Sequence, residues 1–549
     1  MDFNKLAELL FPDITKKPDY YEELYPARNL KSGAKVTRLA PSPTGFIHIG
    51  NLYGAFADER LSRQSEGVFF LRIEDTDEKR YVDGAVDLII SSLSFFGINF
   101  DEGAGAEVDV GAYGPYYQSR RADIYQCFAK QMIINDQAYP CFLTEEEISA
   151  IRTSQEQNKE TPGIYGKWAS SRALSYEQIE SNINEGKPFV IRLKSKGSDG
   201  QIQINDGIRG LIVMPENNQD TVLLKANGIP TYHFAHLVDD RLMRTTHAVR
   251  GEEWLPSLPI HVELFNMFGF PLPIFCHTAQ LMKLDENGNK RKLSKRADPE
   301  LSLDYYMREG YHPKAVREYL LTILNSDYEE WRIANPGSSA DDFPFSLDKM
   351  SNSGTLFDLN KLSDVCKEIL LNISAEELLE FMITWSKKFK PEITHLFESD
   401  KDYTRKILDI GRSGSNPRKD LIYAAQIFEF INYFFDEYFK ITDEIPSNVS
   451  VDDAKAILRA YESSYSHSDD QSVWFEKIRD IGAGLGYAAK PKDYKKNPEL
   501  YKGHVGDVST VIRIALTGRA QSPDIWEIQQ ILGEQKTKQR IEMFFALCR

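Results

Sequence analysis

Cysteine is scarce in this chain and follows no pairing pattern. The 549 residues include only five cysteines, an odd number with no C-x-x-C pair: Cys127, Cys141, Cys276, Cys366 and Cys548. This argues against a disulfide framework and favours a reducing compartment.

Long hydrophobic runs are also missing. No stretch approaches the ~18–20 apolar residues that cross a bilayer. The apolar patch Leu6–Phe11 contains Glu8 and is too short for the core of a signal peptide. The acidic residues among the first 35 argue against a mitochondrial transit peptide. We therefore expect a cytoplasmic protein with no membrane partner.

Positive charge does not dominate. Lys and Arg number 66 against 82 Asp and Glu, which gives a net charge of −16, so any nucleic-acid site must be a local patch. Three basic stretches interrupt the acidic chain: Lys283–Arg296, Arg405–Lys419 and Lys490–Lys502. Such patches can contact phosphates, although a solvated helix face has the same composition.

What the chain does contain points first to a parallel sheet. At about 150 residues per domain, the length predicts roughly three to four domains. The pattern predicts a strand at Val36–Ala40, a break at Pro41–Gly45, a helix at Ile49–Gln64 and a nearly all-apolar strand at Val68–Ile73. Strand, turn, helix and strand in this order make a βαβ unit.

Other regions differ in composition and in predicted secondary structure. From Gln118 to about Asn227, polar helical patterns (121–135 and 145–157) and short strand-like pieces indicate an insertion of different architecture. The segments Thr221–Lys225 and Thr231–Asp240 then return to the pattern of a parallel sheet, and a buried strand follows near Arg250. After Asp298 the pattern is helical, at 313–325, 361–390, 402–440, 451–465 and 473–485. The fold class is therefore α/β, with a parallel-sheet domain interrupted by an insertion and followed by an all-α region.

Two segments carry candidate chemistry. In the turn PSPTGFIHIGN (41–51), unpaired amides at the start of a helix favour phosphate, Gly50 lets a nucleotide approach the backbone, and His48 can donate to a phosphate oxygen. The second segment, KLSKR (292–296), has lysines that can neutralise a pyrophosphate leaving group. Taken singly, His48 is read as a helix cap and the basic run as a solvated loop.

Together, these segments and several longer strings resemble glutamyl-tRNA synthetases of the bacterial type, which are class I aminoacyl-tRNA synthetases. The H-I-G-N turn and K-L-S-K-R are similar to the HIGH and KMSKS motifs of that class. The strings are RLAPSPTGFIHIGN (38–51), FFLRIEDTDEKR (69–80), GPYYQSRR (114–121), GIPTYHFAHLVDDRLM (228–243), RGEEW (250–254), KLSKR (292–296), FDLNKL (357–362) and IALTGRAQSPDIWEI (514–528).

The resemblance implies a domain order. It is an N-terminal extension (1–35), a Rossmann catalytic domain in two halves (36–115 and 226–296), an inserted domain that holds the tRNA acceptor end (116–225), a stem-contact region (297–365) and a helical anticodon-binding region (366–549). The basic stretches Arg405–Lys419 and Lys490–Lys502 fit contacts to the anticodon arm.

The resemblance also implies the reaction. The family activates glutamate with ATP to glutamyl-adenylate and esterifies the 3′-terminal adenosine of tRNA. The catalytic residues would be His48, Lys292 and Lys295, and the ATP-binding residues His48, Gly50, Asn51, Lys292, Ser294 and Lys295. ATP is a substrate, and Mg²⁺ is expected because the triphosphate must be neutralised.

Glutamate carries two carboxylates and one ammonium group, so its pocket should offer two cations and one anion. By resemblance, Arg38 and Tyr232 bind the side-chain carboxylate, and Arg250 binds the α-carboxylate. Glu74 and Ser42 would meet the ammonium group, and His236 would complete the pocket. Glutamine offers no charge to Arg38 and should be rejected.

Three positions depart from the family pattern. Asn51 replaces the last histidine of the HIGH motif, and His236 stands where asparagine is frequent. Some bacterial members hold zinc in the insertion through a C-x-C start, but here only Cys141 is kept and no Cys or His cluster follows. Tetrahedral zinc needs about four ligands, so we expect no zinc and no other protein-bound metal.

Several alternatives stay open. A non-discriminating form would charge glutamine tRNA as well as glutamate tRNA, and a silent relative would bind RNA without catalysis. A glutaminyl-tRNA synthetase is disfavoured by PSPTG and LSKR, and an enzyme that modifies a tRNA base would lack the region 366–549. The expected partners are glutamate and glutamate tRNA, and the expected state is a monomer.

Overall fold

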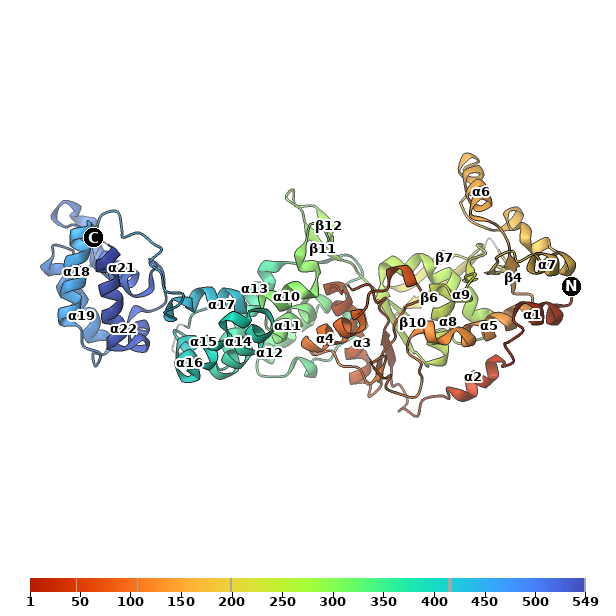
Figure 1. Cartoon of the computed structure of the whole chain (residues 1–549), viewed down its shortest axis with the longest axis horizontal. Coiled ribbons are helices and arrows are strands. Elements are labelled where there is room, and N and C mark those ends of the chain that lie inside the picture. Colours follow the sequence, from red (N-terminus) through yellow and green to blue (C-terminus); the bar gives the residue numbers. More distant parts are fainter. Residues whose placement is uncertain (46, 106, 198–199, 413–416, 548–549) are drawn as a thin grey trace. The chain divides into compact units, whose positions relative to one another are not determined.

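The computed structural model describes residues 1–549 except 46, 106, 198–199, 413–416 and 548–549. The chain divides into two compact units. The first comprises Met1–Asp304 and Arg317–Asp358, and the second Tyr305–Val316 and Leu359–Arg549. Figure 1 shows strands and helices in the first unit and helices in the second. The finer division into six domains stays a prediction.

The predicted βαβ unit is present. Strands β1 (Val36–Leu39) and β2 (Val68–Leu71) pair in parallel, and helix α3 (Ile49–Gln64) connects them. The short strand β3 (Glu102–Gly103) continues the sheet beside β2. All of β1 and most of β2 are buried, as expected for a parallel sheet covered on both faces. The turn at 41–48 therefore lies at the carboxyl end of β1, where α/β sheets bind ligands.

A second parallel pair extends this arrangement. Strands β9 (His247–Gly251) and β10 (Ile274–Thr278) pair in parallel. Helix α9 (Leu258–Met267) lies between them in the chain. The amide of Thr246 donates to the carbonyl of Val36 over 2.9 Å and joins the start of β9 to the start of β1. Parallel strands that start together also end together, so the carboxyl ends of β1 and β9 lie at one edge.

The insertion has its own antiparallel structure. Strands β4 (Ala138–Cys141), β5 (Val190–Leu193) and β8 (Val222–Leu224) form one sheet. A separate hairpin joins β6 (Gln201–Asp206) to β7 (Gly210–Pro215). Apolar side chains of this hairpin pack on a buried cluster that includes Phe275 of β10. The hairpin is thus attached to the parallel-sheet part of the unit.

The sequence prediction for the segment after the insertion was wrong in two respects. Thr221–Lys225 supplies β8 to the antiparallel sheet of the insertion, not a parallel strand. The segment after Thr231 is helix α8 (Tyr232–Leu242), with Phe234, Leu237 and Val238 fully buried. A helix that is buried on most of its faces has a run of apolar residues that is easily mistaken for a buried strand.

The N-terminal extension forms helices α1 (Phe3–Leu10) and α2 (Pro18–Leu24), which pack on α5 (Ala122–Ile134). The buried ammonium group of Lys130 donates to the carbonyls of Phe11 and Ile14.

The other elements of the first unit, or shared with the second, are α4 (Ala85–Phe95), α6 (Glu145–Gln157), α7 (Tyr176–Asn184), β11 (Leu281–Leu284), β12 (Lys290–Lys292), α10 (Leu303–Glu309), α11 (Pro313–Leu324), α12 (Tyr328–Ala334) and β13 (Thr355–Leu356).

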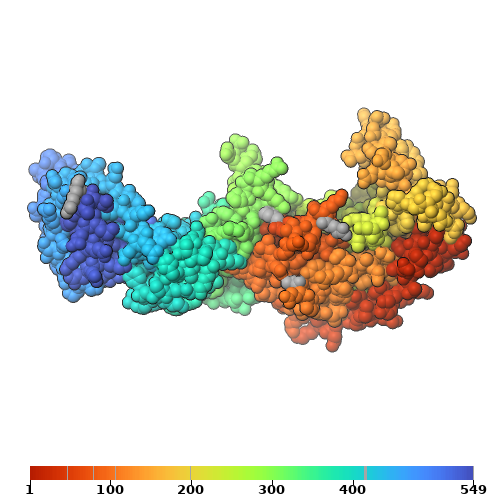
Figure 2. Space-filling view, in the orientation of Figure 1, coloured from red at the N-terminus to blue at the C-terminus, as the bar shows by residue number. Residues whose placement is uncertain are grey.

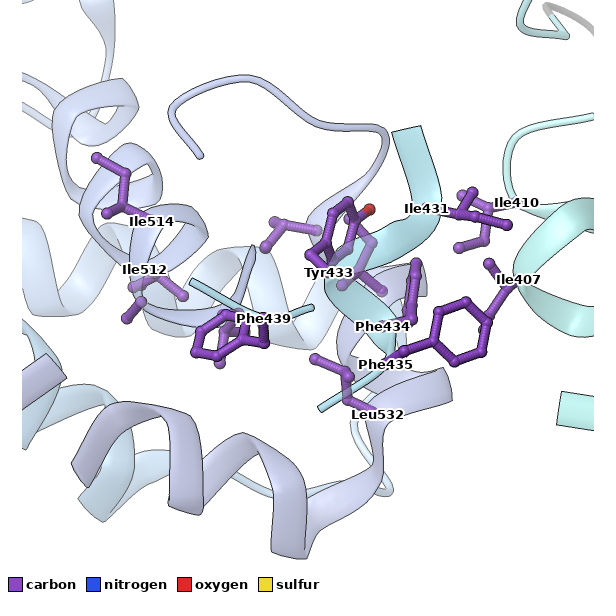
Figure 3. Packing of buried hydrophobic residues seen from close by; sticks show 14 of the residues in the cluster. Ile407, Ile410, Ile431, Tyr433, Phe434, Phe435, Phe439, Ile512, Ile514 and Leu532 are labelled. Carbon is purple, nitrogen blue, oxygen red and sulfur yellow. The ribbon is translucent and has the colours of Figure 1, made fainter. Parts of the chain in front are cut away.

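The second unit is almost entirely helical, as predicted. Its helices are α13 (Leu359–Asn372), α14 (Ala375–Phe389), α15 (Pro391–Glu398), α16 (Lys401–Asp409), α17 (Ala424–Ile431), α18 (Val451–Ser464), α19 (Gln471–Gly484), α20 (Pro491–Lys496), α21 (Val505–Thr517) and α22 (Ile525–Leu547). Figure 3 shows Phe434, Phe435 and Phe439 packed among isoleucine and leucine side chains from distant helices. Burial of such apolar surface is the main stabilising contribution to the unit.

The prediction of a helical segment across 402–440 was wrong in its middle and at its end. Helix α16 ends at Asp409, and α17 runs only from Ala424 to Ile431. Gly411 has a φ of +65°, and Pro417 follows it, so the chain cannot continue as a helix here.

In the part of the chain that the structure describes, no helix is both long and apolar enough to cross a membrane.

Candidate active site

A cavity of about 510 Å³ lies at the carboxyl ends of the parallel strands. Every sequence-predicted site residue lines it except His236 and Ser294. Those that do are Arg38, Ser42, His48, Gly50, Asn51, Glu74, Tyr232, Arg250, Lys292 and Lys295. Asp58, Glu253 and Trp254, which the sequence analysis did not single out, line it as well.

His48 caps helix α3 and also faces the cavity. Its Nδ1 accepts from the amide of Asn51 over 3.2 Å, and the Asn51 side chain accepts from the His48 amide over 3.1 Å. The cap and the functional interpretations of His48 are therefore compatible. Because Nδ1 is used as an acceptor, a neutral His48 carries its proton on Nε2. Burial, with a smaller effect of Lys295 and Lys292, lowers the pKa of His48 to about 4, so the ring is neutral at pH 7.

This cap gives a structural role to Asn51 and to Gly50. Asn51 supplies the side-chain acceptor that closes a reciprocal capping pair. A Cβ on Gly50 would lie 3.0 Å from Nδ1 and 3.1 Å from Cε1 of His48. Glycine at this position leaves room for the ring in its capping position.

We expect Gly50→Ala to displace the His48 ring. The lost cap should lower the free energy of unfolding by about 1 kcal/mol. Misplacement of the ring should slow glutamate activation about 10- to 100-fold. Urea unfolding and AMP release measure the two effects. Gly484→Ala, where the new Cβ has open space, is the control for stability; equal behaviour of the two variants would contradict this role of Gly50.

The basic loop follows a hairpin of strands β11 and β12, which projects from the surface of its unit (Figures 1 and 2). Lys292 and Lys295 are exposed and line the cavity. The loop is held by Asp298, which accepts from the guanidinium of Arg291 over 2.6 and 2.7 Å and from the amide of Ser294 over 2.9 Å. The Arg291 contact holds the pKa of Asp298 well below its usual range. Asp298 was not identified from the sequence.

Ser294 was predicted to bind ATP, but the structure does not bring it to the cavity. The amide of Ser294 donates to Asp298, and its hydroxyl accepts from the amide of Ala297 over 3.4 Å. Both contacts are made within the loop, and the role of Ser294 in ATP binding stays a prediction.

Arg38 lies buried at the end of β1 and is held on one edge. Its Nε donates to both carboxylate oxygens of Asp240, at 3.2 and 3.3 Å, and its Nη1 donates to the carbonyl of Val249 over 3.2 Å. Within the described part of the chain, Nη2 makes no hydrogen bond. The guanidinium is thus fixed from behind and keeps donor capacity toward the cavity.

Asp240 is shared with a second buried arginine. Nη1 of Arg72 donates to its Oδ1 over 2.6 Å, and Nη2 lies 3.4 Å from Oε1 of Glu74. Burial would raise the pKa of Asp240, but Arg38 and Arg72 lower it overall. For Glu74 the balance is reversed, because burial raises its pKa more than the two arginines lower it. Arg38, Glu74 and their partners form one connected network.

Tyr232 begins helix α8 and stacks on Trp254, with ring centroids 4.1 Å apart. Trp254 belongs to the RGEEW string but was not assigned a role from it. Two flat rings in contact form a rigid wall beside Arg38 and Arg250.

Arg250, at the end of β9, is surrounded by histidines. Its Nε donates to His277, and its Nη1 lies 2.9 Å from Nδ1 of His261. Neither histidine was identified from the sequence. Because they come from α9 and β10, their convergence depends on the tertiary fold.

His236 was predicted to bind substrate, but it is fully buried behind the cavity wall. Its ring is stacked 6.0 Å from Tyr232 and lies 4.3 Å from His261. Nδ1 is 3.1 Å from a carboxylate oxygen of Asp240, but the geometry is not that of a hydrogen bond, and neither ring nitrogen has a hydrogen-bond partner among the described residues. In this position His236 supports Tyr232 and does not reach the cavity.

Burial lowers the pKa of several histidines from 6.5 to about 4: His48, His233, His247 and His312. Between pH 6.5 and 4 the unfolded chain binds more protons at these sites than the folded chain does. We therefore expect the unfolding temperature to be level above pH 6.5 and to fall by on the order of 5 °C or more toward pH 4.

Thermal scans of two variants check this expectation. His247→Gln removes one buried titrating ring and should flatten the slope, whereas His467→Gln on the surface should leave it unchanged. A slope that is the same in all three proteins would contradict it.

Metal ligands are not gathered in the described residues. No group of three or more His, Cys, Asp or Glu side chains there has the arrangement to hold a metal ion. Cys141 of the insertion is buried in β4, where the hydroxyl of Ser171 lies 3.7 Å from its sulfur. Mg²⁺ binds one or two carboxylates together with substrate phosphates, and for this cavity it stays an expectation.

The basic stretches of the second unit are partly neutralised. In Arg405–Lys419, of which 413–416 lie outside the described residues, Arg405, Arg418 and Lys419 pair with Asp402, Asp420 and Glu368. In the other stretch Lys502 pairs with Asp453. A role in nucleic-acid binding stays a prediction for both.

Comparisons with known proteins agree with this arrangement. Residues 35–364 match the family described as "tRNA synthetases class I (E and Q), catalytic domain", and residues 376–545 match "Anticodon binding domain". The glutamate–tRNA ligase of Acetivibrio thermocellus is 63% identical over 544 residues, which cover 99% of this chain and 100% of that protein. That of Clostridium perfringens strain SM101 is 47% identical over 553 residues, with 100% of both chains covered.

A solved structure is similar as well. The glutamate tRNA ligase of Elizabethkingia meningosepticum, in complex with its amino acid, superposes with a TM-score of 0.73 at 26% identity. The alignment covers 94% of this chain and 100% of that one. The similarity therefore extends over both compact units.

Proposed function

We propose that this chain, which belongs to the class I tRNA synthetases for glutamate and glutamine, is a glutamate–tRNA ligase. The observation that carries the proposal is the cavity itself. Two buried guanidinium groups, of Arg38 and Arg250, and the carboxyl group of Glu74 line one cavity with His48, Lys292 and Lys295. The amino-acid groups and the phosphate groups of the reaction thus find complementary charges in one place.

Glutamate binds through its three charged groups. Arg38 takes the side-chain carboxylate beside Tyr232, and Arg250 takes the α-carboxylate. Glu74 and Ser42 receive the ammonium group. Glutamine is rejected because its amide offers no negative charge to the donors that Arg38 directs toward the cavity.

Activation begins when an oxygen of the α-carboxylate attacks the α-phosphorus of ATP. The bond to the bridging oxygen breaks, and pyrophosphate leaves as the mixed anhydride forms. His48 donates from Nε2 to a phosphate oxygen, and Lys292 and Lys295 stabilise the negative charge that develops on the leaving group. Gly50 and Asn51 hold His48 in place. Bound Mg²⁺ would neutralise charge on the triphosphate.

In the second step, a hydroxyl of the 3′-terminal adenosine of tRNA attacks the acyl carbon, and AMP leaves. The partner is glutamate tRNA, and the region matched as an anticodon binding domain supports contact with the anticodon arm. The enzyme acts as a monomer in the cytoplasm, where translation occurs.

A second candidate is a non-discriminating ligase that also charges glutamine tRNA. The test is charging of purified glutamate tRNA and glutamine tRNA, side by side, with labelled glutamate. Charging of glutamate tRNA alone establishes a discriminating ligase. Charging of both means that the cell requires an amidotransferase for the mischarged product.

A silent RNA-binding relative is the remaining alternative. It predicts that both tRNAs bind and neither is charged. The cavity residues speak against it, because a protein without catalysis has no need for Lys292, Lys295 and a neutral His48 beside charges that complement glutamate.

A further inference from the structure

Arg250 differs from the other buried arginines of the site in the groups that bind its guanidinium. Arg38 and Arg72 are both paired with the carboxylate of Asp240. Arg250 forms no ion pair with any described residue; its guanidinium donates to two imidazole rings and also interacts with the hydroxyl of Tyr232. Its Nη2 is buried and has no partner in the same described set. The cation is thus oriented without being neutralised, which leaves its full charge for an anionic ligand.

The hydrogen bonds around Arg250 require defined tautomers. Since Nε of Arg250 can only donate, Nε2 of His277 must be the acceptor over 2.9 Å. In neutral His277 the proton is then on Nδ1, which lies 2.6 Å from Oδ2 of Asp206. On the other side, Nδ1 of His261 accepts from Arg250, so Nε2 of His261 donates to Nδ1 of His233 over 3.1 Å.

Asp206 is the anionic end of this chain of hydrogen bonds. It is buried at the end of β6, outside the residues that line the cavity. Its carboxylate also accepts from the amides of Ile208 and Arg209, each over 3.0 Å. Burial raises its pKa, but the hydrogen bond from His277 and these amides lower it overall, so Asp206 is ionised at pH 7.

The strand register explains why the inserted hairpin reaches the site. Arg250 and His277 are direct neighbours across the β9–β10 pair. The amide of Gly207, in the turn of the hairpin, donates to the carbonyl of Phe275 over 2.8 Å. Arg209 donates to the carbonyl of His277 over 3.1 Å and pairs with Glu252. The turn of the hairpin is therefore fixed along the edge of β10 that does not pair with β9.

We propose that Asp206 and His277 are positioning residues that orient Arg250 for the α-carboxylate of the amino acid. Asp206 selects the tautomer of His277 in which Nε2 accepts from Arg250. The inserted hairpin thereby contributes to the amino-acid site without contacting the substrate. This inference rests on the proposed function of Arg250 as the α-carboxylate ligand.

Asp206→Asn tests the tautomer. The Asn oxygen still accepts from the amides of Ile208 and Arg209, so the turn is kept. Its amide favours the other tautomer of His277, with a proton on Nε2 that faces the Nε–H of Arg250. We expect KM for glutamate in tRNA charging to rise roughly 10- to 100-fold, because a buried donor loses its acceptor. KM values for ATP and tRNA should stay within about twofold.

His277→Gln distinguishes a positioning role of Asp206, which acts through His277, from a purely structural role of Asp206. The Gln oxygen can accept from Arg250 whatever stands at position 206. Asp206→Asn should therefore have little effect in the His277→Gln background, so the double-mutant cycle is strongly non-additive. His277→Phe, which keeps a ring but has no acceptor, should raise KM for glutamate as much as Asp206→Asn does, and it tests the inference even if the Asp206 variant does not fold.

The compound γ-aminobutyrate lacks the α-carboxylate, so it shows whether the weaker binding of glutamate arises at the α-carboxylate site. As a competitive inhibitor it should bind wild type and Asp206→Asn equally. Unchanged KM for glutamate in both Asp206→Asn and His277→Phe, or an equal loss of γ-aminobutyrate binding, would overturn the inference. If wild type charges glutamate but these results fail, only the inference is wrong; if wild type charges nothing, the proposed function is wrong.

Discussion

Replacing both Lys292 and Lys295 with alanine is expected to lower the rate of glutamyl-adenylate formation by about 10³-fold or more. Removal of a single preorganised group that stabilises developing charge costs about 10²- to 10³-fold in other enzymes. Both lysines line the cavity, and after burial, which is the main cause, their charges add to the lowering of the His48 pKa. Since both side chains are exposed, the fold should be unaffected. AMP release in the presence of glutamate and tRNA measures the rate, and tRNA binding should change only a few-fold.

The matched control removes two lysines elsewhere. Lys31 and Lys187 are exposed on the same unit; Lys31 pairs with Glu66, and Lys187 with Glu185 and Asn182. Their double replacement by alanine changes the net charge equally and should leave the rate within about twofold. Retained activity in the Lys292 and Lys295 variant would contradict the proposed mechanism.

Arg38→Lys is expected to lower kcat/KM for glutamate about 10²- to 10³-fold. Lysine keeps the positive charge beside Asp240, so the buried carboxylate is not left uncompensated. It loses the planar fork, however, and one ammonium group cannot hold Asp240 and the Val249 carbonyl while also binding a carboxylate in two places. The loss should appear mainly in KM for glutamate, with KM for ATP unchanged.

Arg152→Lys is the control for this substitution, because Arg152 is exposed and pairs only with Glu156 on the next turn of α6. Unfolding in urea should show that both variants are folded. Wild-type kcat/KM in Arg38→Lys would show that Arg38 does not bind the side-chain carboxylate.

The parts of the fold with strong local signals could be predicted from the sequence. Pro41 to Gly45 forbids both helix and strand, so the βαβ unit and the helix Ile49–Gln64 were placed correctly. Helix α8 was not recognised, because a helix buried on most sides lacks the amphipathic period. The break near Gly411 was missed although Gly411, Gly414 and Pro417 stand close together in the sequence, a composition typical of a loop.

For the site, the residues at the mouth of the cavity were found through their motifs, whereas the residues behind them were not. Asp240, His261 and His277 come from three different elements, and no local pattern links them to Arg38 or Arg250. One signal was present in the sequence. Two adjacent aspartates, 239 and 240, end an otherwise apolar run, and buried acids of this kind require cationic partners.

The most direct test of the account is ATP-dependent charging of purified glutamate tRNA by the wild-type protein, with labelled glutamate and labelled glutamine in parallel. The account predicts that glutamate becomes attached to the tRNA and that glutamine is attached at least about 10²-fold less efficiently. Binding of the tRNA without attachment of glutamate, or equal attachment of both amino acids, would contradict it.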